Sequence, residues 1–246
     1  MTPEHLRKEL KSSVQRVRDG FIIAFIAMLV SIPQIKHQSG FFYERYTGKS
    51  PDPEGLMQFF LAQLIILLSA LVIIVLVGNL ANRRAGLEPF AWPGLKRLLL
   101  LLVLGVIYIP GMYFLCDHLL LALLPEVYPA KLGYALLYPL SSSFPNELFM
   151  RYGFLGLAAW ILGKVKGGKT LANFFVAALF TLFDWYDITR SIDTPFQAIE
   201  AVFFMAGVFF QHLIAGALYL KYGFFGSLAF RLGVDLKYLL YYFLFF

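Results

Sequence analysis

The sequence has little charge and almost no cysteine. Of its 246 residues, only 15% are Asp, Glu, Lys or Arg, whereas 59% are hydrophobic. A soluble domain of this size needs more charge to cover its surface, so the composition excludes an ordinary water-soluble globule. A single cysteine, Cys116, excludes an internal disulfide and any metal site built from several cysteines. We interpret it as a small apolar residue on a helix.

Long apolar runs are what the sequence has instead. Runs of about twenty residues match a hydrocarbon core of roughly 30 Å. They predict an all-α, polytopic membrane protein with about seven transmembrane helices, at 20–35, 56–80, 98–123, 137–162, 171–186, 196–220 and 224–246. No signal-peptide cleavage site follows the first run, so we expect that run to be retained. We divide the chain into an N-terminal amphipathic segment with three helices (1–130) and a core of four helices (131–246).

The distribution of basic residues predicts the topology. Thirteen Lys or Arg lie before the first run or in the loops after the second, fourth and sixth, and only five lie in the alternate loops. Basic residues concentrate on the cytoplasmic side, so we expect a cytoplasmic N-terminus and an outward-facing connection at 36–55. Segment 5–18 is either an interfacial amphipathic helix or a solvated helical cap. The formal charge of +6 indicates contact with the lipid bilayer, not with nucleic acid.

Several ionisable side chains fall inside the predicted spans, where each costs about 2.5–3.5 kcal/mol on insertion scales. They are Glu147, Arg151, Asp184, His212, Arg231 and Asp235. Glu147 and Arg151 are four residues apart, as are Arg231 and Asp235, so each pair shares a helix face. Two interpretations stay open: a structural network of salt bridges between helices, or a catalytic or transport site.

Pro145 stands directly before Asn146 and Glu147. A proline within a helix kinks it and frees backbone groups, and irregular backbone at membrane depth is tolerated mainly where it lines a water-filled cavity. We therefore expect a wet pocket around Glu147. The serines at 141–143 would line its outward entrance, although serines also serve as helix-packing contacts.

Three motifs in the second half of the chain resemble those of a known family. The stretch from Asn146 to Leu155, NELFMRYGFL, is similar to the Glu-Glu-x-x-x-Arg motif of the CPBP intramembrane proteases, which include the type II CAAX prenyl endopeptidases and their bacterial relatives. Residues 180–184 correspond to the family's Phe-x-x-x-His motif, and 231–235 to its His-x-x-x-Asn/Asp motif. The resemblance covers about 137–246. It implies a prokaryotic plasma-membrane protein that acts on a membrane-associated protein or peptide.

The resemblance also implies roles for particular residues. Glu147 would be the general base that activates water, Arg151 would orient it, and Asp235 would help to stabilise the oxyanion. Three positions differ from the family's motifs: Asn146 replaces a glutamate, and Asp184 and Arg231 replace the two histidines. A guanidinium has no lone pair for a metal, so we expect neither zinc nor another cofactor. The opposite charges of Asp184 and Arg231 predict a salt bridge between their helices.

Two functions stay open after these departures. One is a divergent endopeptidase that uses Glu147. The other is a catalytically inactive relative that serves as a membrane scaffold and binds a protein or lipid partner in the old substrate cavity. His212 either faces the same pocket and transfers protons, or is bonded to a neighbouring helix. A transporter or a bacteriocin-immunity protein is less favoured; the transporter lacks support, because the chain shows no inverted repeat and no paired broken helices.

Overall fold

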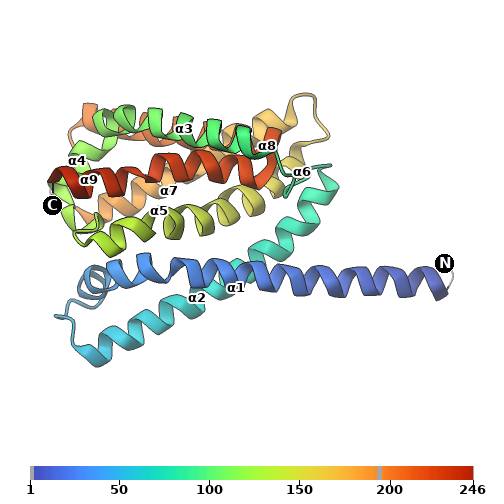
Figure 1. Cartoon of the computed structure of the whole chain (residues 1–246), viewed down its shortest axis with the longest axis horizontal. Coiled ribbons are helices and arrows are strands. Elements are labelled where there is room, and N and C mark those ends of the chain that lie inside the picture. Colours follow the sequence, from blue (N-terminus) through green and yellow to red (C-terminus); the bar gives the residue numbers. More distant parts are fainter. Residues whose placement is uncertain (1–2, 193–195, 246) are drawn as a thin grey trace.

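The structure is a computed structural model that describes residues 3–192 and 196–245, with the side chains of 3–14 and 16 left aside. Within these ranges the chain is helical and contains no strand, which confirms the all-α prediction. The helices run roughly along one direction, except that the second helix crosses the bundle at a slant (Figure 1).

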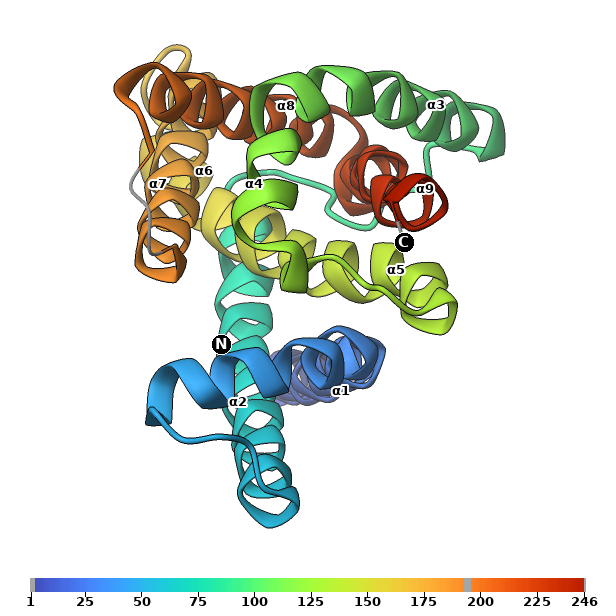
Figure 2. The same ribbon diagram turned by 90° about the vertical axis from the view of Figure 1, so that its left-hand side faces the viewer.

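Helices α1 (Pro3–Thr47) and α2 (Pro53–Arg84) pack against each other and cross (Figure 2). The predicted connection at 36–55 is wrong for most of its length, because α1 continues through Pro33 to Thr47. Contacts made by its last turns outweigh the one hydrogen bond that a proline removes. Ser39, for example, lies 3.0 Å from the Gln63 side chain of α2. Segment 5–18 is helical within α1, but most of its side chains lie outside the description, so its amphipathic face stays a prediction.

The third run forms one helical path of three parts: α3 (Leu95–Met112), the π-helix η1 (Tyr113–Asp117) and α4 (His118–Leu123). The path continues past Pro110, as predicted, and the π-turn begins three residues after it. Such turns often accompany a break in the regular hydrogen-bond ladder. The short 3₁₀ helix η2 (Pro125–Val127) follows.

The fourth run also contains a π-helix. It consists of α5 (Leu132–Glu147), η3 (Leu148–Leu155) and α6 (Gly156–Leu162). The π-winding begins three residues after Pro145, so the expected irregularity is present. Its form is a widened helical turn.

The last three helices are α7 (Gly168–Ser191), α8 (Ala198–Asp235) and α9 (Lys237–Phe245). Helix α8 is broken at Gly223, whose φ of 72° and ψ of −169° lie in a region that glycine alone adopts readily. The break falls between the predicted sixth and seventh spans.

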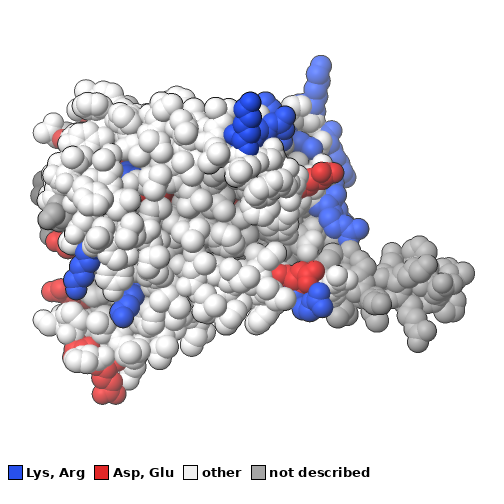
Figure 3. Space-filling view, in the orientation of Figure 1, with Lys and Arg blue, Asp and Glu red and all other residues white. Residues whose placement is uncertain are grey.

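Five helical segments are long and apolar enough to cross a membrane: Val17–Thr47, Pro53–Arg84, Leu95–Leu123, Gly168–Ser191 and Ala198–Phe245. Many large apolar side chains point outward; Ile66, Leu100 and Phe114 are 68%, 68% and 73% exposed. Figure 3 shows a middle zone that is almost free of charged side chains, between two ends that carry most of the visible Lys, Arg, Asp and Glu. Apolar surface of this extent indicates an integral membrane protein.

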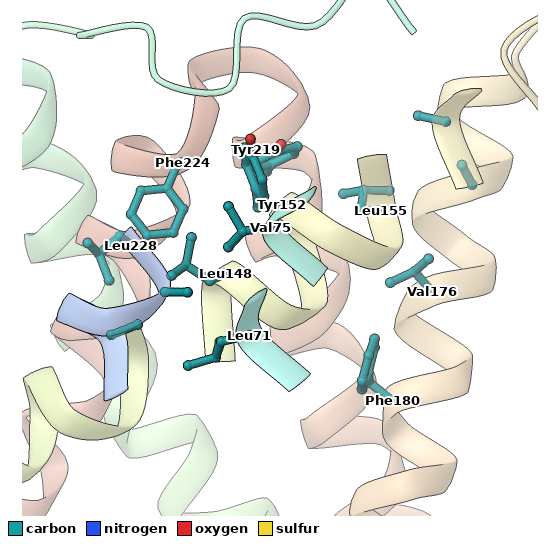
Figure 4. Close-up of a cluster of buried hydrophobic side chains, with 14 of the residues drawn as sticks. Leu71, Val75, Leu148, Tyr152, Leu155, Val176, Phe180, Tyr219, Phe224 and Leu228 are labelled. Atoms are coloured by element: carbon teal, nitrogen blue, oxygen red, sulfur yellow. The ribbon is translucent and has the colours of Figure 1, made fainter. Parts of the chain in front are cut away.

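The main apolar core holds η3 in place. Leu148 and Tyr152 of η3 pack with Leu71 and Val75 of α2, and Phe180 of α7 belongs to the same cluster (Figure 4). On the other side of the bundle, α3 and α8 approach closely, where glycines from both helices face each other. The motif-bearing helix is thus fixed between α2, α7 and α8.

Candidate functional site

A polar cavity of about 310 Å³ lies among α1, η1, α5, α7, α8 and α9. We call it the polar cavity. The side chains on its wall that matter for the argument below are Gln34, Tyr138, Ser142, Asn146, Asp184, Asp187, Gln211, Arg231 and Lys237. Charged groups and neutral amides thus meet in a space enclosed by membrane-spanning helices, which is costly unless these groups are hydrated, paired or bound to a ligand.

Helix α5 presents one stripe of side chains to the polar cavity. Tyr138, Ser142 and Asn146 follow one another at four-residue spacing, which keeps them on the same helix face. The neighbouring stripe contains Ser143 and Glu147, and neither lines the cavity. Each residue of an α-helix is turned by about 100° from the one before it, so the cavity-facing position of Asn146 directs Glu147 elsewhere.

Glu147 is therefore not in a wet pocket, and that expectation is wrong. Its side chain is 1% exposed, and Oε2 lies 3.9 Å from Nε of Arg151, which is equally buried. Oε2 makes no hydrogen bond within the described part of the chain, and neither do Nε and Nη1 of Arg151. The pair is an ion pair in the helix-packing core, as the four-residue spacing predicts.

His212 connects this pair to the polar cavity. Nη2 of Arg151 lies 3.1 Å from Nδ1 of His212, and Nε2 of His212 lies 2.9 Å from Oδ2 of Asp184. A guanidinium can only donate, so Nδ1 accepts. His212 is then the neutral tautomer with its proton on Nε2, which donates to Asp184. Both ring nitrogens are engaged, which matches the interpretation of a histidine bonded to neighbouring helices.

The predicted salt bridge between Asp184 and Arg231 is wrong. Asp184 is paired with His212, and Nε of Arg231 lies 3.3 Å from Oδ2 of Asp235 one turn away. Ser143 also donates to that Oδ2, at 2.8 Å. Each charge has a nearer partner, so the two line the same cavity without touching.

The sequence interpretation missed a third ion pair, which is buried. Asp117 is fully buried on η1, and Nζ of Lys237 lies 2.7 Å from its Oδ1. The hydroxyls of Tyr128 and Tyr241 donate to the same carboxylate, at 2.9 and 3.1 Å. Lys237 within the last apolar run was the signal, because a lysine at that depth needs an acid nearby.

The six predicted site residues thus fall into two groups. Asp184 and Arg231 line the polar cavity, whereas Glu147, Arg151, His212 and Asp235 stand behind its wall. Across residues 3–192 and 196–245, no group of three or more His, Cys, Asp or Glu side chains is arranged to hold a metal ion.

Comparisons with protein-family models, with curated proteins and with solved structures found no match to this chain.

Proposed function

We propose that this protein is a catalytically inactive relative of the CPBP intramembrane proteases that binds a polar segment of a membrane-associated protein or peptide in the polar cavity. One observation carries the proposal. The motif residues on the cavity wall are Asn146, Asp184 and Arg231, while the expected base Glu147 is turned away and paired with Arg151.

The chemistry of the cavity wall fits binding better than hydrolysis. An amide such as Asn146 is no base at neutral pH, and a guanidinium stays protonated. His212 has no free ring nitrogen to accept a proton from water. A general base must reach the proton that it abstracts directly or through one water, and Glu147 lacks access to the cavity.

Neutral polar groups on the wall support a polar ligand. Gln211 and Ser142 are 4% and 3% exposed, and neither side chain makes a hydrogen bond to the described residues. Polar side chains that face a cavity and bond to no protein group are favourable there only with water or a ligand as partner. Amide and hydroxyl groups are suited to the backbone of an extended peptide, and a volume of about 310 Å³ admits a short segment.

The proposal includes a topology of seven membrane passes with a cytoplasmic N-terminus, in a prokaryotic plasma membrane. The helical path at 132–162 measures about 46 Å at 1.5 Å per residue, which is enough for one crossing. The break at Gly223 divides the 48-residue candidate span into two crossings. Lys and Arg gather at the end of the molecule near the α2–α3 and α6–α7 connections, as the positive-inside rule requires (Figure 3).

Peptide binding and peptide cleavage can be measured on the same sample. We expect the purified protein in nanodiscs to bind fluorescent membrane peptides saturably and to leave them intact over hours. Gln211→Leu should weaken binding, whereas Gln58→Leu, the same change at an exposed position on α2 outside the cavity, should not. Cleavage by the wild type that Glu147→Gln abolishes would overturn the proposal and establish the endopeptidase alternative. Failure to bind any peptide would also overturn it.

A further inference from the structure

We propose that the polar cavity binds a positively charged group, the ammonium or guanidinium of a lysine or arginine in the bound peptide, between Asp184 and Asp187. This inference rests on the proposed function, because it assumes that a peptide enters the cavity. It specifies that the peptide residue bound in the cavity is positively charged.

The cations in and behind the cavity wall are already matched by acids. Three pairs account for them: Lys237 with Asp117 at 2.7 Å, Arg231 with Asp235 at 3.3 Å, and Arg151 with Glu147 at 3.9 Å. His212 is neutral, because its Nδ1 accepts from a guanidinium. No cation of these pairs remains to balance a further acid.

Asp184 and Asp187 are the two carboxylates left over. They are three residues apart on α7, so they share a face, and both line the cavity. Asp184 receives a hydrogen bond from neutral His212, and Asp187 has no ion pair among the described residues. The Arg45 guanidinium acts on the charge of Asp187 but makes no ion pair with it: Arg45 donates to the Arg190 carbonyl, and the Arg190 guanidinium lies over the Tyr186 ring.

The two negative charges lie within one helix turn of each other, so together they attract a cation more strongly than either does alone. An ammonium group can donate three hydrogen bonds and a guanidinium five. Two carboxylates on one side of the cation therefore accept only some of the hydrogen bonds that it can donate.

A second observation, independent of the acids, points to the same ligand. Gln211 of α8 is 4% exposed, lines the cavity and has no hydrogen-bond partner in the described ranges. Ser142 on α5 is in the same situation. Their oxygens can accept the remaining N–H groups of the cation, and the Gln211 amide can donate to the peptide backbone. The cavity thus offers charge from α7 and neutral partners from α5 and α8.

A pair of peptides that differ in one charge tests the inference. One apolar membrane peptide carries a single lysine, and its twin carries norleucine at the same position. In nanodiscs of zwitterionic lipid, we expect wild-type protein to bind the lysine peptide about tenfold more tightly. The Asp184→Asn/Asp187→Asn double variant should bind both peptides equally. Glu126→Gln, which removes an exposed acid outside the cavity, should keep the preference.

The outcomes separate this inference from the proposed function. Equal binding of both peptides by the wild type would overturn the charge selection and leave peptide binding standing. Binding of neither peptide would remove both. A third outcome is that the wild type binds free spermidine, the double variant does not, and the norleucine peptide does not bind at all. This outcome would overturn the selection of a peptide residue and indicate a site for small amines. The melting temperature and elution volume of each variant test whether it is folded. If the double variant does not fold, the single variant Asp187→Asn, at an exposed position, is measured in its place.

Discussion

Replacing Lys237 by methionine should destabilise the protein strongly. At an effective dielectric constant of about 20, unit charges 2.7 Å apart attract each other by about 6 kcal/mol. The cost of removing both groups from water offsets part of this attraction. Removing one partner of such a pair costs about 3–5 kcal/mol, since the other charge stays buried. The hydroxyls of Tyr128 and Tyr241 still donate to Asp117, but they carry no charge to balance it. Methionine keeps an unbranched side chain of similar length, so the loss reports mainly the charge.

A double-mutant cycle measures the pair itself. Asp117→Asn, Lys237→Met and their combination are unfolded in mixed micelles by titration with a denaturing detergent, followed by tryptophan fluorescence. The combined variant should cost less than the sum of the single ones, by about 1–3 kcal/mol. Lys164→Met, at an exposed position, should change little. Strictly additive costs, or a Lys237→Met variant as stable as the wild type, would refute the idea that this ion pair ties α9 to η1.

Three further predictions follow from backbone and pairing geometry. Gly105→Ala should lower the free energy of unfolding by about 1–3 kcal/mol, because the added Cβ would lie 2.1 Å from a backbone oxygen of α8. Gly111→Ala, whose Cβ meets open space, should be nearly neutral in the same unfolding assay. Gly223→Ala should lower the melting temperature, since a φ of 72° with extended ψ strains any residue with a Cβ by about 1–3 kcal/mol. Asp184→Asn and Arg231→Gln should be additive in stability, because they belong to different pairs; a combined cost below their sum would instead reveal a direct interaction.

Much of the fold could be predicted from the apolar runs, because their lengths are set by the membrane. Helix ends were less predictable. The first predicted span ends at 35, soon after Pro33, yet tertiary contacts extend the helix to Thr47. Propensity is a weak guide where packing decides, and a single proline removes only one hydrogen bond.

The charged residues of the site could be found in the sequence, but their partners could not. Spacing identified the pairs within one helix, Glu147 with Arg151 and Arg231 with Asp235, since four residues make one turn. Pairs between helices depend on how each helix is rotated, which spacing does not record. For that reason the charges predict Arg231 as the partner of Asp184, although His212 is its partner, and spacing does not reveal the pairing of Asp117 with Lys237.

Helix rotation also decides which motif residue meets a ligand. The stripe of Tyr138, Ser142 and Asn146 faces the polar cavity, and it is fixed by Gln38 of α1, which donates to the Tyr138 hydroxyl at 2.7 Å. Ser143, one turn before Glu147, is held on the other face by its bond to an aspartate of α8. Turning Glu147 into the cavity would require rotating α5 by about 100° and breaking both contacts. For the first motif to place a carboxylate in this cavity, that carboxylate would therefore have to stand at position 146, where this chain has asparagine.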